Sequence, residues 1–416
     1  MRPSTYLDSL CLRGFKEVSF AVMVKPNRSG VVWSAVLALV AVLAAGTLAL
    51  AQTDPASLDA LMRAAQLGPY QPQEEDWEAI EAAAKKEGEV VIYSLSSRHP
   101  TVAAIFEERY GIKVHYAGLG TEEQLARLNA QQRAGRPEAD VLFLAEHPQV
   151  NQWIEEGRLV GYVPRYLEPV IPVSMRTPAL KHATEVLTVF YNNDTYSESP
   201  VSSWWDLTKP EWHGKIFSGD YTTSAPYQQL FAAWIQEADE LEAEYERVFG
   251  EPIQYTQPYQ NAGWELLKRL LDQKPRRLSS PAELMTTLAT PGFDGLVLLG
   301  TGQIRRAPEL LRTNPDGSLD LPLSTAITPK WGLLFSHNYV IPTTAPHPNA
   351  AKLLVRFLAE REGYEPWHTP GSFPVRTDFD PPEYTPALDP DTVWVPDLLF
   401  LDEIQAELLD FMRLYE

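Results

Sequence analysis

The sequence predicts an α/β fold built on doubly wound parallel sheets, and three observations support this prediction. Short apolar strands alternate with amphipathic helices three times between residues 89 and 156. These strands are apolar almost throughout, as expected of strands that helices cover on both faces. The chain has 416 residues, which is long enough for two such domains.

The first sheet is predicted from residues 77 to 156, and its helix ends carry recognisable signals. Gly88 closes the first helix, because glycine readily adopts the left-handed conformation of a C-cap. Thr121 and Gln124 have the spacing of a capping box that opens a later helix. The expected order is helix 77–88, strand 89–93, helix 100–110, strand 112–116, a helix from 121, strand 140–144 and helix 148–156.

The second half of the chain has wider spacing between elements and ends in a proline-rich stretch, residues 365–397. Its most prominent feature is a long amphipathic helix over residues 226–249. The other expected elements are strands 186–191, 215–217, 295–299 and 331–341, and helices 204–207, 264–271, 349–360 and 398–415.

The N-terminal segment has the pattern of an export signal. Residues 31–51 carry no charge, Lys25 and Arg28 precede them, and Ala49-Leu50-Ala51 has the form of a cleavage site. An uncleaved membrane anchor is the alternative, because 21 apolar residues can span a bilayer. The prediction is a protein that is periplasmic or exported to the bacterial cell surface, with residues 1–51 either removed or kept as an anchor.

Composition and motifs exclude several functional classes. The net charge of −20 argues against binding to nucleic acid and to anionic membrane surfaces. The single cysteine, Cys11, rules out an intrachain disulfide and cysteine-based metal centres. The sequence has no nucleophile-elbow, zinc-protease, P-loop or dinucleotide-binding motif, so we expect neither an enzyme nor a resident cofactor.

Several short motifs, taken in order, resemble a known family. The run Lys85–Ser94 is similar to the mature start of solute-binding proteins of ABC importers, and more specifically to extracellular solute-binding protein family 1 and its ferric-iron-type branch. Further matching runs are Ser96–His99, Arg136–Leu142, Phe190–Asn192, Trp205–Leu207, Trp212–Ile216 and Pro346–Leu353. The resemblance covers about residues 75–365.

The resemblance implies a two-lobe periplasmic-binding-protein fold of type II-like topology, in which crossing strands join two parallel-sheet lobes. The protein would act as a monomer that captures a small solute between the lobes and delivers it to an inner-membrane ABC permease. A membrane-tethered sensory module with the same fold is the alternative. The expected segments are a lead-in (52–76), lobe 1 (77–180), lobe 2 (181–325), a return to lobe 1 (326–364) and a C-terminal extension (365–416).

The candidate ligand-binding residues follow from the rule that ligands bind beyond the carboxyl ends of strands in open α/β sheets. Loops at these ends carry hydroxyl groups and free backbone N–H groups, which favour anions. The set is Ser96, Ser97, Thr121, Glu146, Tyr191, Tyr221, Thr222, Thr223, Ser224 and Trp331. Each has a structural alternative as a cap, turn or core residue.

The ligand is predicted to be a small anionic or polar solute rather than bare ferric iron. In the ferric branch, tyrosinate oxygens hold the metal, including an adjacent Tyr-Tyr pair. This sequence has no Tyr-Tyr dipeptide and reads Gly300-Thr-Gly-Gln303 near the expected position. His99 is kept as a candidate metal ligand, with Pro100 in place of the family's tyrosine. A metal, a metal chelate and a ferric-iron-type importer component stay open as alternatives.

Overall fold

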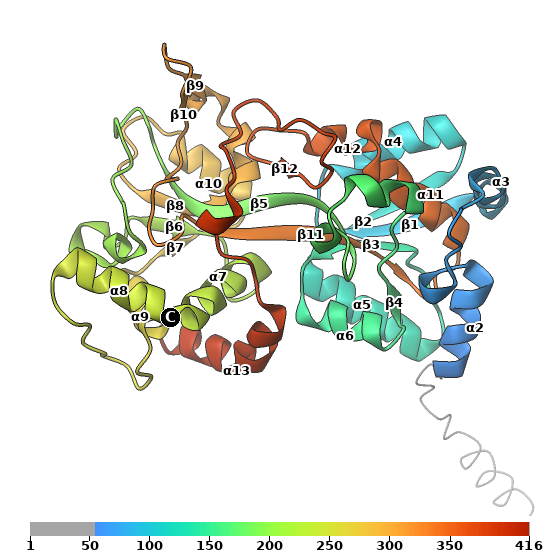
Figure 1. Cartoon of the computed structure of the whole chain (residues 1–416), viewed down its shortest axis with the longest axis horizontal. Coiled ribbons are helices and arrows are strands. Elements are labelled where there is room, and N and C mark those ends of the chain that lie inside the picture. Colours follow the sequence, from blue (N-terminus) through green and yellow to red (C-terminus); the bar gives the residue numbers. More distant parts are fainter. Residues whose placement is uncertain (1–54, 416) are drawn as a thin grey trace, which may run out of the picture. The chain divides into compact units, whose positions relative to one another are not determined.

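The computed structural model describes residues 55–415 (Figure 1). The predicted export segment and anchor, residues 31–51, lie outside the described residues. Within residues 55–415, no helix is both long and apolar enough to cross a bilayer.

The helices are α2 (Pro55–Ala65), α3 (Trp77–Glu87), α4 (His99–Tyr110), α5 (Thr121–Ala134), α6 (Pro148–Glu155), α7 (Ala225–Gln236), α8 (Ala238–Phe249), α9 (Ala262–Asp272), α10 (Pro281–Leu288), α11 (Pro348–Ala359), α12 (Arg361–Tyr364) and α13 (Leu398–Leu414). The strands are β1 (Glu89–Ser94), β2 (Lys113–Gly118), β3 (Val141–Ala145), β4 (Leu159–Val160), β5 (Leu180–Tyr191), β6 (Ile216–Ser218), β7 (Arg276–Arg277), β8 (Leu296–Gly300), β9 (Arg312–Thr313), β10 (Leu319–Asp320), β11 (Leu333–Pro342) and β12 (Phe373–Pro374).

The part of the chain around β1, β2 and β3, which we call lobe 1, is a doubly wound parallel sheet. The strand order is β2-β1-β3, and both pairs are parallel. Side chains of α3, α4 and α11 form one core cluster with these strands, and side chains of α5 and α6 form another. Helices thus cover both faces of the sheet, which lets its strands bury their apolar side chains. The predicted alternation of strands and helices is confirmed for this sheet.

Two long strands, β5 and β11, connect lobe 1 to the rest of the sheet. They pair antiparallel to each other and lie side by side through the middle of Figure 1. Near its end β11 pairs with β3, while the far end of β5 pairs with β8. The sheet order β2-β1-β3-β11-β5-β8-β6-β7 thus continues from one lobe into the other. This arrangement confirms the predicted α/β fold with crossing strands.

The part around β6, β7 and β8, which we call lobe 2, has its own large core. Strands β6 and β8 are parallel, and β6 also pairs with β7. Helices α7 and α9 pack against each other over a cluster rich in tryptophan, of which Trp204, Trp205 and Trp234 are completely buried. These three indole rings lie within the lobe 2 core.

The C-terminal extension contacts both lobes. β12 pairs with β5 beside the crossing strands. Further along, Trp394 is buried in the lobe 2 core, and α13 lies along α7, as Figure 1 shows. α13 also contacts α6 of lobe 1.

Two local predictions are wrong. The expected helix over 226–249 is two helices, α7 and α8, because Glu237 leaves the helical conformation with ψ near 37°. The expected capping box at Thr121 does not form, since Gly120 is the N-cap of α5 and no side chain caps the helix. The Thr121 hydroxyl accepts a hydrogen bond from the Ala145 backbone N–H instead, at 3.1 Å. Tertiary contacts between neighbouring loops thus replace a local cap.

Candidate functional site

A cavity of about 770 Å³ lies where the two lobes meet. The crossing strands supply part of its wall, with Glu185 and Leu187 on β5 and Phe335 and His337 on β11. Loops at the carboxyl ends of β1, β2 and β3 line it from lobe 1, and loops after β6, β7 and β8 line it from lobe 2. This is the position that the topology of open α/β sheets favours for a ligand, and the volume suits a small organic solute.

Three helices begin at this cavity with no side-chain cap. They are α4 and α5 of lobe 1 and α7 of lobe 2, whose N-cap residues are Arg98, Gly120 and Ser224. The first backbone N–H groups of a helix have no partner within the helix, and the helix dipole places partial positive charge there. Both lobes therefore present groups that attract an anion to the same cavity.

Three arginines, Arg98, Arg305 and Arg306, add full positive charges to the same wall. Within residues 55–415, none of the three guanidinium groups lies in an ion pair with a carboxylate. Burial lowers the pKa of Arg98, and burial together with the charges of Arg98 and Arg306 lowers the pKa of Arg305 to about 10. Arginine side chains are not deprotonated in proteins at neutral pH, so both groups are cations. One atom of Arg98, Nη2, is buried and has no hydrogen-bond partner in the described chain.

One buried carboxylate, that of Glu185, faces this positive cluster. Glu185 is 6% exposed, and burial raises its pKa, while Arg98 and Arg305 oppose that shift. The Gln303 side chain and the Gly302 backbone N–H hydrogen-bond to it. A Cβ atom on Gly300 or Gly302 would lie about 2.5 or 2.4 Å from the Glu185 carboxylate oxygens, so both glycines are needed for this close approach.

Five of the predicted site residues line the cavity: Ser96, Ser97, Thr121, Thr223 and Ser224. Tyr221 and Thr222 belong to the same loop as Thr223 but are not among the lining residues. The Thr222 hydroxyl donates to Asp220 Oδ1 at 2.7 Å, and the Tyr221 ring lies under the Arg277 guanidinium. The structure thus brings together loops of both lobes, as the sequence argument expected.

Glu146, Tyr191 and Trp331 do not line the cavity. Glu146 is buried and forms an ion pair with Lys181, with 2.9 Å between Oε1 and Nζ. Tyr191 is the last residue of β5 and is buried in the lobe 2 core. Trp331 is buried in the same core, and its indole N–H donates to Thr392 Oγ1 at 3.1 Å.

His99 is placed in the lobe 1 interior rather than in the cavity. It is 2% exposed, its Nδ1 is 2.8 Å from Ser94 Oγ, and its Nε2 is 3.2 Å from the Tyr339 hydroxyl. Burial lowers its pKa to about 3, so the ring is neutral. Among the residues that the structure describes, no group of three or more His, Cys, Asp or Glu side chains is arranged to hold a metal ion.

Tyr227, which lines the cavity, is engaged with the backbone. It is buried, and its hydroxyl donates to Leu298 O at 2.7 Å and accepts from the Gly219 N–H at 2.8 Å. Burial raises its pKa, which opposes formation of a phenolate. This hydroxyl is therefore not a ready ligand for ferric iron.

Sequence reasoning did not single out the charged residues of the cavity, namely Arg98, Glu185, Arg305 and Arg306. Each had a visible signal. Arg98 stands in the loop after the first strand, and Arg305 and Arg306 follow a buried strand and two glycines. Glu185 interrupts a strand that is otherwise largely apolar in its second half.

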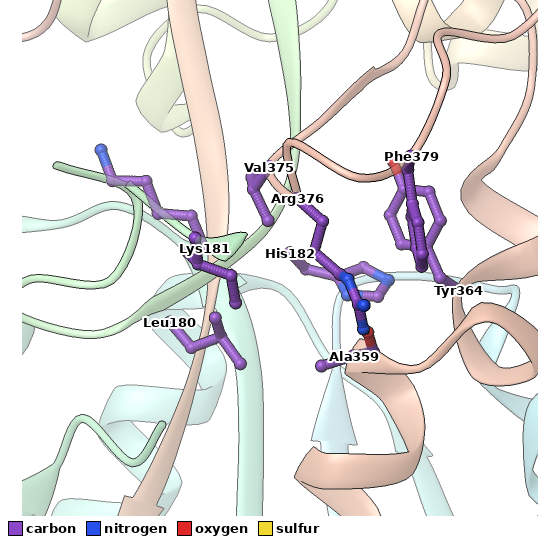
Figure 2. A pocket seen from close by; sticks show the side chains of 9 residues that line it. Leu180, Lys181, His182, Ala359, Tyr364, Val375, Arg376 and Phe379 are labelled. Carbon is purple, nitrogen blue, oxygen red and sulfur yellow. The ribbon is translucent and has the colours of Figure 1, made fainter. Parts of the chain in front are cut away.

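A second cavity beside β5 is much smaller, at about 10 Å³. Figure 2 shows its walls, which include His182, Tyr364, Arg376 and Phe379. That volume is about the size of one water molecule. The cavity between the lobes is therefore the candidate site for a solute.

Comparisons with known proteins agree with this architecture. The iron-bound HitA of Pseudomonas aeruginosa superposes with a TM-score of 0.59 at 18% identity, covering 79% of this chain and 99% of that one. The ferric binding protein of Campylobacter jejuni gives 0.58 at 17%, covering 78% and 99%. The Trichodesmium protein (IdiA, FutA) in complex with iron and citrate gives 0.54 at 15%, covering 79% and 99%. These similarities show the periplasmic-binding-protein fold.

A sequence comparison with curated proteins gives no match. The sequence model for bacterial extracellular solute-binding proteins, in contrast, matches residues 101–390, which is more than half of the chain. The matched range contains lobe 2 and most of lobe 1, although β1 and the cavity-lining loop that follows it precede the range. The chain therefore belongs to the bacterial extracellular solute-binding protein family.

Proposed function

We propose that this protein is the extracytoplasmic binding component of an ABC importer, and that it captures a small anionic solute between its lobes for delivery to a membrane permease. Membership of an extracellular solute-binding family supports a role outside the cytoplasm. One observation supports an anionic ligand. Three arginines without carboxylate ion pairs share a cavity with the uncapped N-termini of helices from both lobes.

The mechanism follows from the position of the cavity. A solute that contacts both lobes stabilises the conformation in which the lobes are closer, so binding shifts the equilibrium toward closure. The crossing strands β5 and β11 are the connection about which such a movement would occur. A permease could then distinguish the loaded protein from the empty one by its shape.

A binding role without catalysis is also part of the proposal. Within residues 55–415, a serine hydroxyl and a histidine ring, the arrangement of a nucleophile and its base, meet at Ser94 and His99, 2.8 Å apart. Both residues are buried, and neither lines the large cavity. A solute in that cavity would therefore not reach the serine hydroxyl.

A ferric chelate is the second candidate ligand. The observation in its favour is that two proteins with this fold, HitA and the Trichodesmium protein, hold iron, the latter together with citrate. In this chain the cavity offers arginines rather than a cluster of acidic or histidine ligands. Iron that arrives inside a negatively charged chelate would suit such a site better than the bare ion.

Calorimetric titration of the purified protein against inorganic phosphate, glucose 6-phosphate, citrate, ferric citrate and ferric chloride tests the function. We expect saturable binding of at least one anionic compound, and a smaller radius of gyration by small-angle X-ray scattering when it is bound. Saturable binding with no compaction would contradict the closing mechanism. Tight binding of ferric chloride with a visible charge-transfer band would contradict the anionic ligand.

A further inference from the structure

We infer that the arginine-lined end of the cavity is a subsite for a compact dianion, namely the phosphoryl group of an organic phosphate monoester or phosphonate. This inference rests on the proposed function and narrows its ligand class. The observations that support it are the number of guanidinium groups, the buried carboxylate of Glu185 beside them, and the apolar side chains that line the same cavity.

The balance of charged side chains that line the cavity favours a ligand group with two negative charges. Arg98, Arg305 and Arg306 contribute three positive charges, and Glu185 contributes at most one negative charge. Of the other acidic residues that line the cavity, Asp220 is 3.5 Å from the Arg277 guanidinium, and the Glu122 side chain is 64% exposed, so that solvent and salt screen its charge. A ligand with two negative charges would therefore neutralise the excess.

The shape of guanidinium groups favours a phosphoryl group over one carboxylate. Each guanidinium presents N–H donors in a planar fork that matches pairs of oxygen atoms. A phosphoryl group offers three terminal oxygens in a tetrahedral arrangement, one for each of the three arginines that line the cavity. A carboxylate has two oxygens and one charge, so it would leave part of the cluster unsatisfied. The buried Nη2 of Arg98, which has no partner in the described chain, is one donor available to such a group.

Hydrogen bonds within the cluster hold the arginine side chains in place before a ligand binds. Arg305 Nη1 donates to Gly302 O at 3.2 Å and to Gln303 Oε1 at 3.3 Å, and Arg306 Nε donates to the same Gln303 oxygen at 2.9 Å. The Arg98 guanidinium lies 5.7 Å from the Trp367 ring centroid. Such fixed donors lose less conformational entropy on binding than free side chains do.

The rest of the cavity is suited to an organic group attached to the anion. Its volume of about 770 Å³ greatly exceeds that of a phosphate ion. Apolar side chains line it beside hydroxyl groups: Leu187, Leu278, Leu284, Leu299 and Phe335, with Ser279 and Ser280. Inorganic phosphate would fill one end only. An organic phosphate would gain apolar contacts and hydrogen bonds in addition.

The experiment compares glucose 6-phosphate, inorganic phosphate, glucose and citrate by calorimetry on the full-length protein and four variants. We expect glucose 6-phosphate and inorganic phosphate to bind, and glucose to bind far more weakly. Arg305→Gln and Arg98→Gln should each weaken phosphate binding by about 10- to 100-fold, because each removes charge-assisted hydrogen bonds. Arg312→Gln, on β9 outside the cavity, is the matched control and should leave affinity unchanged.

Glu185→Gln tests the direction in which the charge of Glu185 changes the affinity for phosphate. It keeps the side-chain shape but removes a like charge, so inorganic phosphate should bind several-fold more tightly. A loss of affinity would overturn the charge argument. Unchanged thermal midpoints and circular dichroism would show that the variants fold.

The two proposals fail in different ways. If citrate or ferric citrate binds and compacts the protein while both phosphates do not bind, the phosphoryl subsite is wrong and the importer function stands. If no anion binds the folded wild-type protein, both fail. Equal weakening by Arg305→Gln and Arg312→Gln would show a general charge effect and would overturn the subsite.

Discussion

Replacing Phe411 by alanine tests whether α13, which lies beyond the range matched to the family, is an integral part of lobe 2. Phe411 is 3% exposed. Its ring lies 4.7 Å from the Trp264 ring and 6.0 Å from the Tyr259 ring, measured between centroids. Leu408 and Met412 of the same helix are completely buried. We therefore expect a loss of stability rather than a local rearrangement without cost.

The magnitude follows from the burial of the ring. Removing a fully buried phenylalanine costs about 3–5 kcal/mol, which includes the transfer of the ring to water and the cavity left behind. Phe411 lies on the last helix of the chain, where neighbouring side chains can move to fill part of the space. We therefore expect a decrease of about 3 kcal/mol in the free energy of unfolding.

The assay is equilibrium unfolding in urea, followed by tryptophan fluorescence and far-ultraviolet circular dichroism. Leu399→Ala is the matched control, because Leu399 is on the same helix but 76% exposed. That control should change stability by less than about 0.5 kcal/mol. If Phe411→Ala costs less than about 1 kcal/mol while hydrogen exchange in α13 becomes fast, α13 is a separately unfolding appendage and the reasoning is refuted.

Two further predictions concern charged groups. Asp397 caps α13 by accepting hydrogen bonds from the Leu399 and Phe400 N–H groups, each at 3.0 Å, so Asp397→Ala should cost about 1 kcal/mol in urea unfolding. The Phe400 N–H lowers the pKa of Asp397, so the ionised cap stabilises the fold above the ordinary pKa of 3.8, and this stabilisation is lost as the pH falls below that value. If Asp397→Ala costs the same free energy of unfolding at pH 7 and at pH 2.5, this reasoning is contradicted. Lys181→Met should cost about 3 kcal/mol, because it leaves the buried Glu146 carboxylate without its partner. The double variant with Glu146→Gln should recover most of that loss, and no recovery would show that the pair is not coupled.

The fold could be predicted from the sequence because its dominant signals are local. Strands such as 89–93 and 140–144 are short, apolar and flanked by glycine-terminated helices, so the periodicity alone identifies them. The division of residues 226–249 into two helices has no comparable signal. Helix-forming residues continue through Glu237, although the structure ends α7 and begins α8 at that residue.

The candidate site could be predicted only in part, because only some of its features depend on local sequence. The rule for strand ends depends on sequence order, so it could place five residues at the cavity: Ser96, Ser97, Thr121, Thr223 and Ser224. Which side chains actually meet depends on the register between β5 and β8, which sets Glu185 beside Gly300 and Gly302. No single-sequence pattern reports that register.

The contrast between the charge of the whole chain and the charge of the cavity follows from the range of electrostatic forces. The chain carries a net charge of −20, yet the wall formed by Arg98, Arg305 and Arg306 is positive. At physiological salt, charges on the exposed surface are screened over about 8 Å, so acidic helix faces such as that of α8 act weakly inside the cavity. Buried charges are screened much less, and their effect on a ligand is correspondingly greater. Net charge therefore describes what the outer surface repels, whereas the solute proposed above would be selected by the few charged groups that line the cavity.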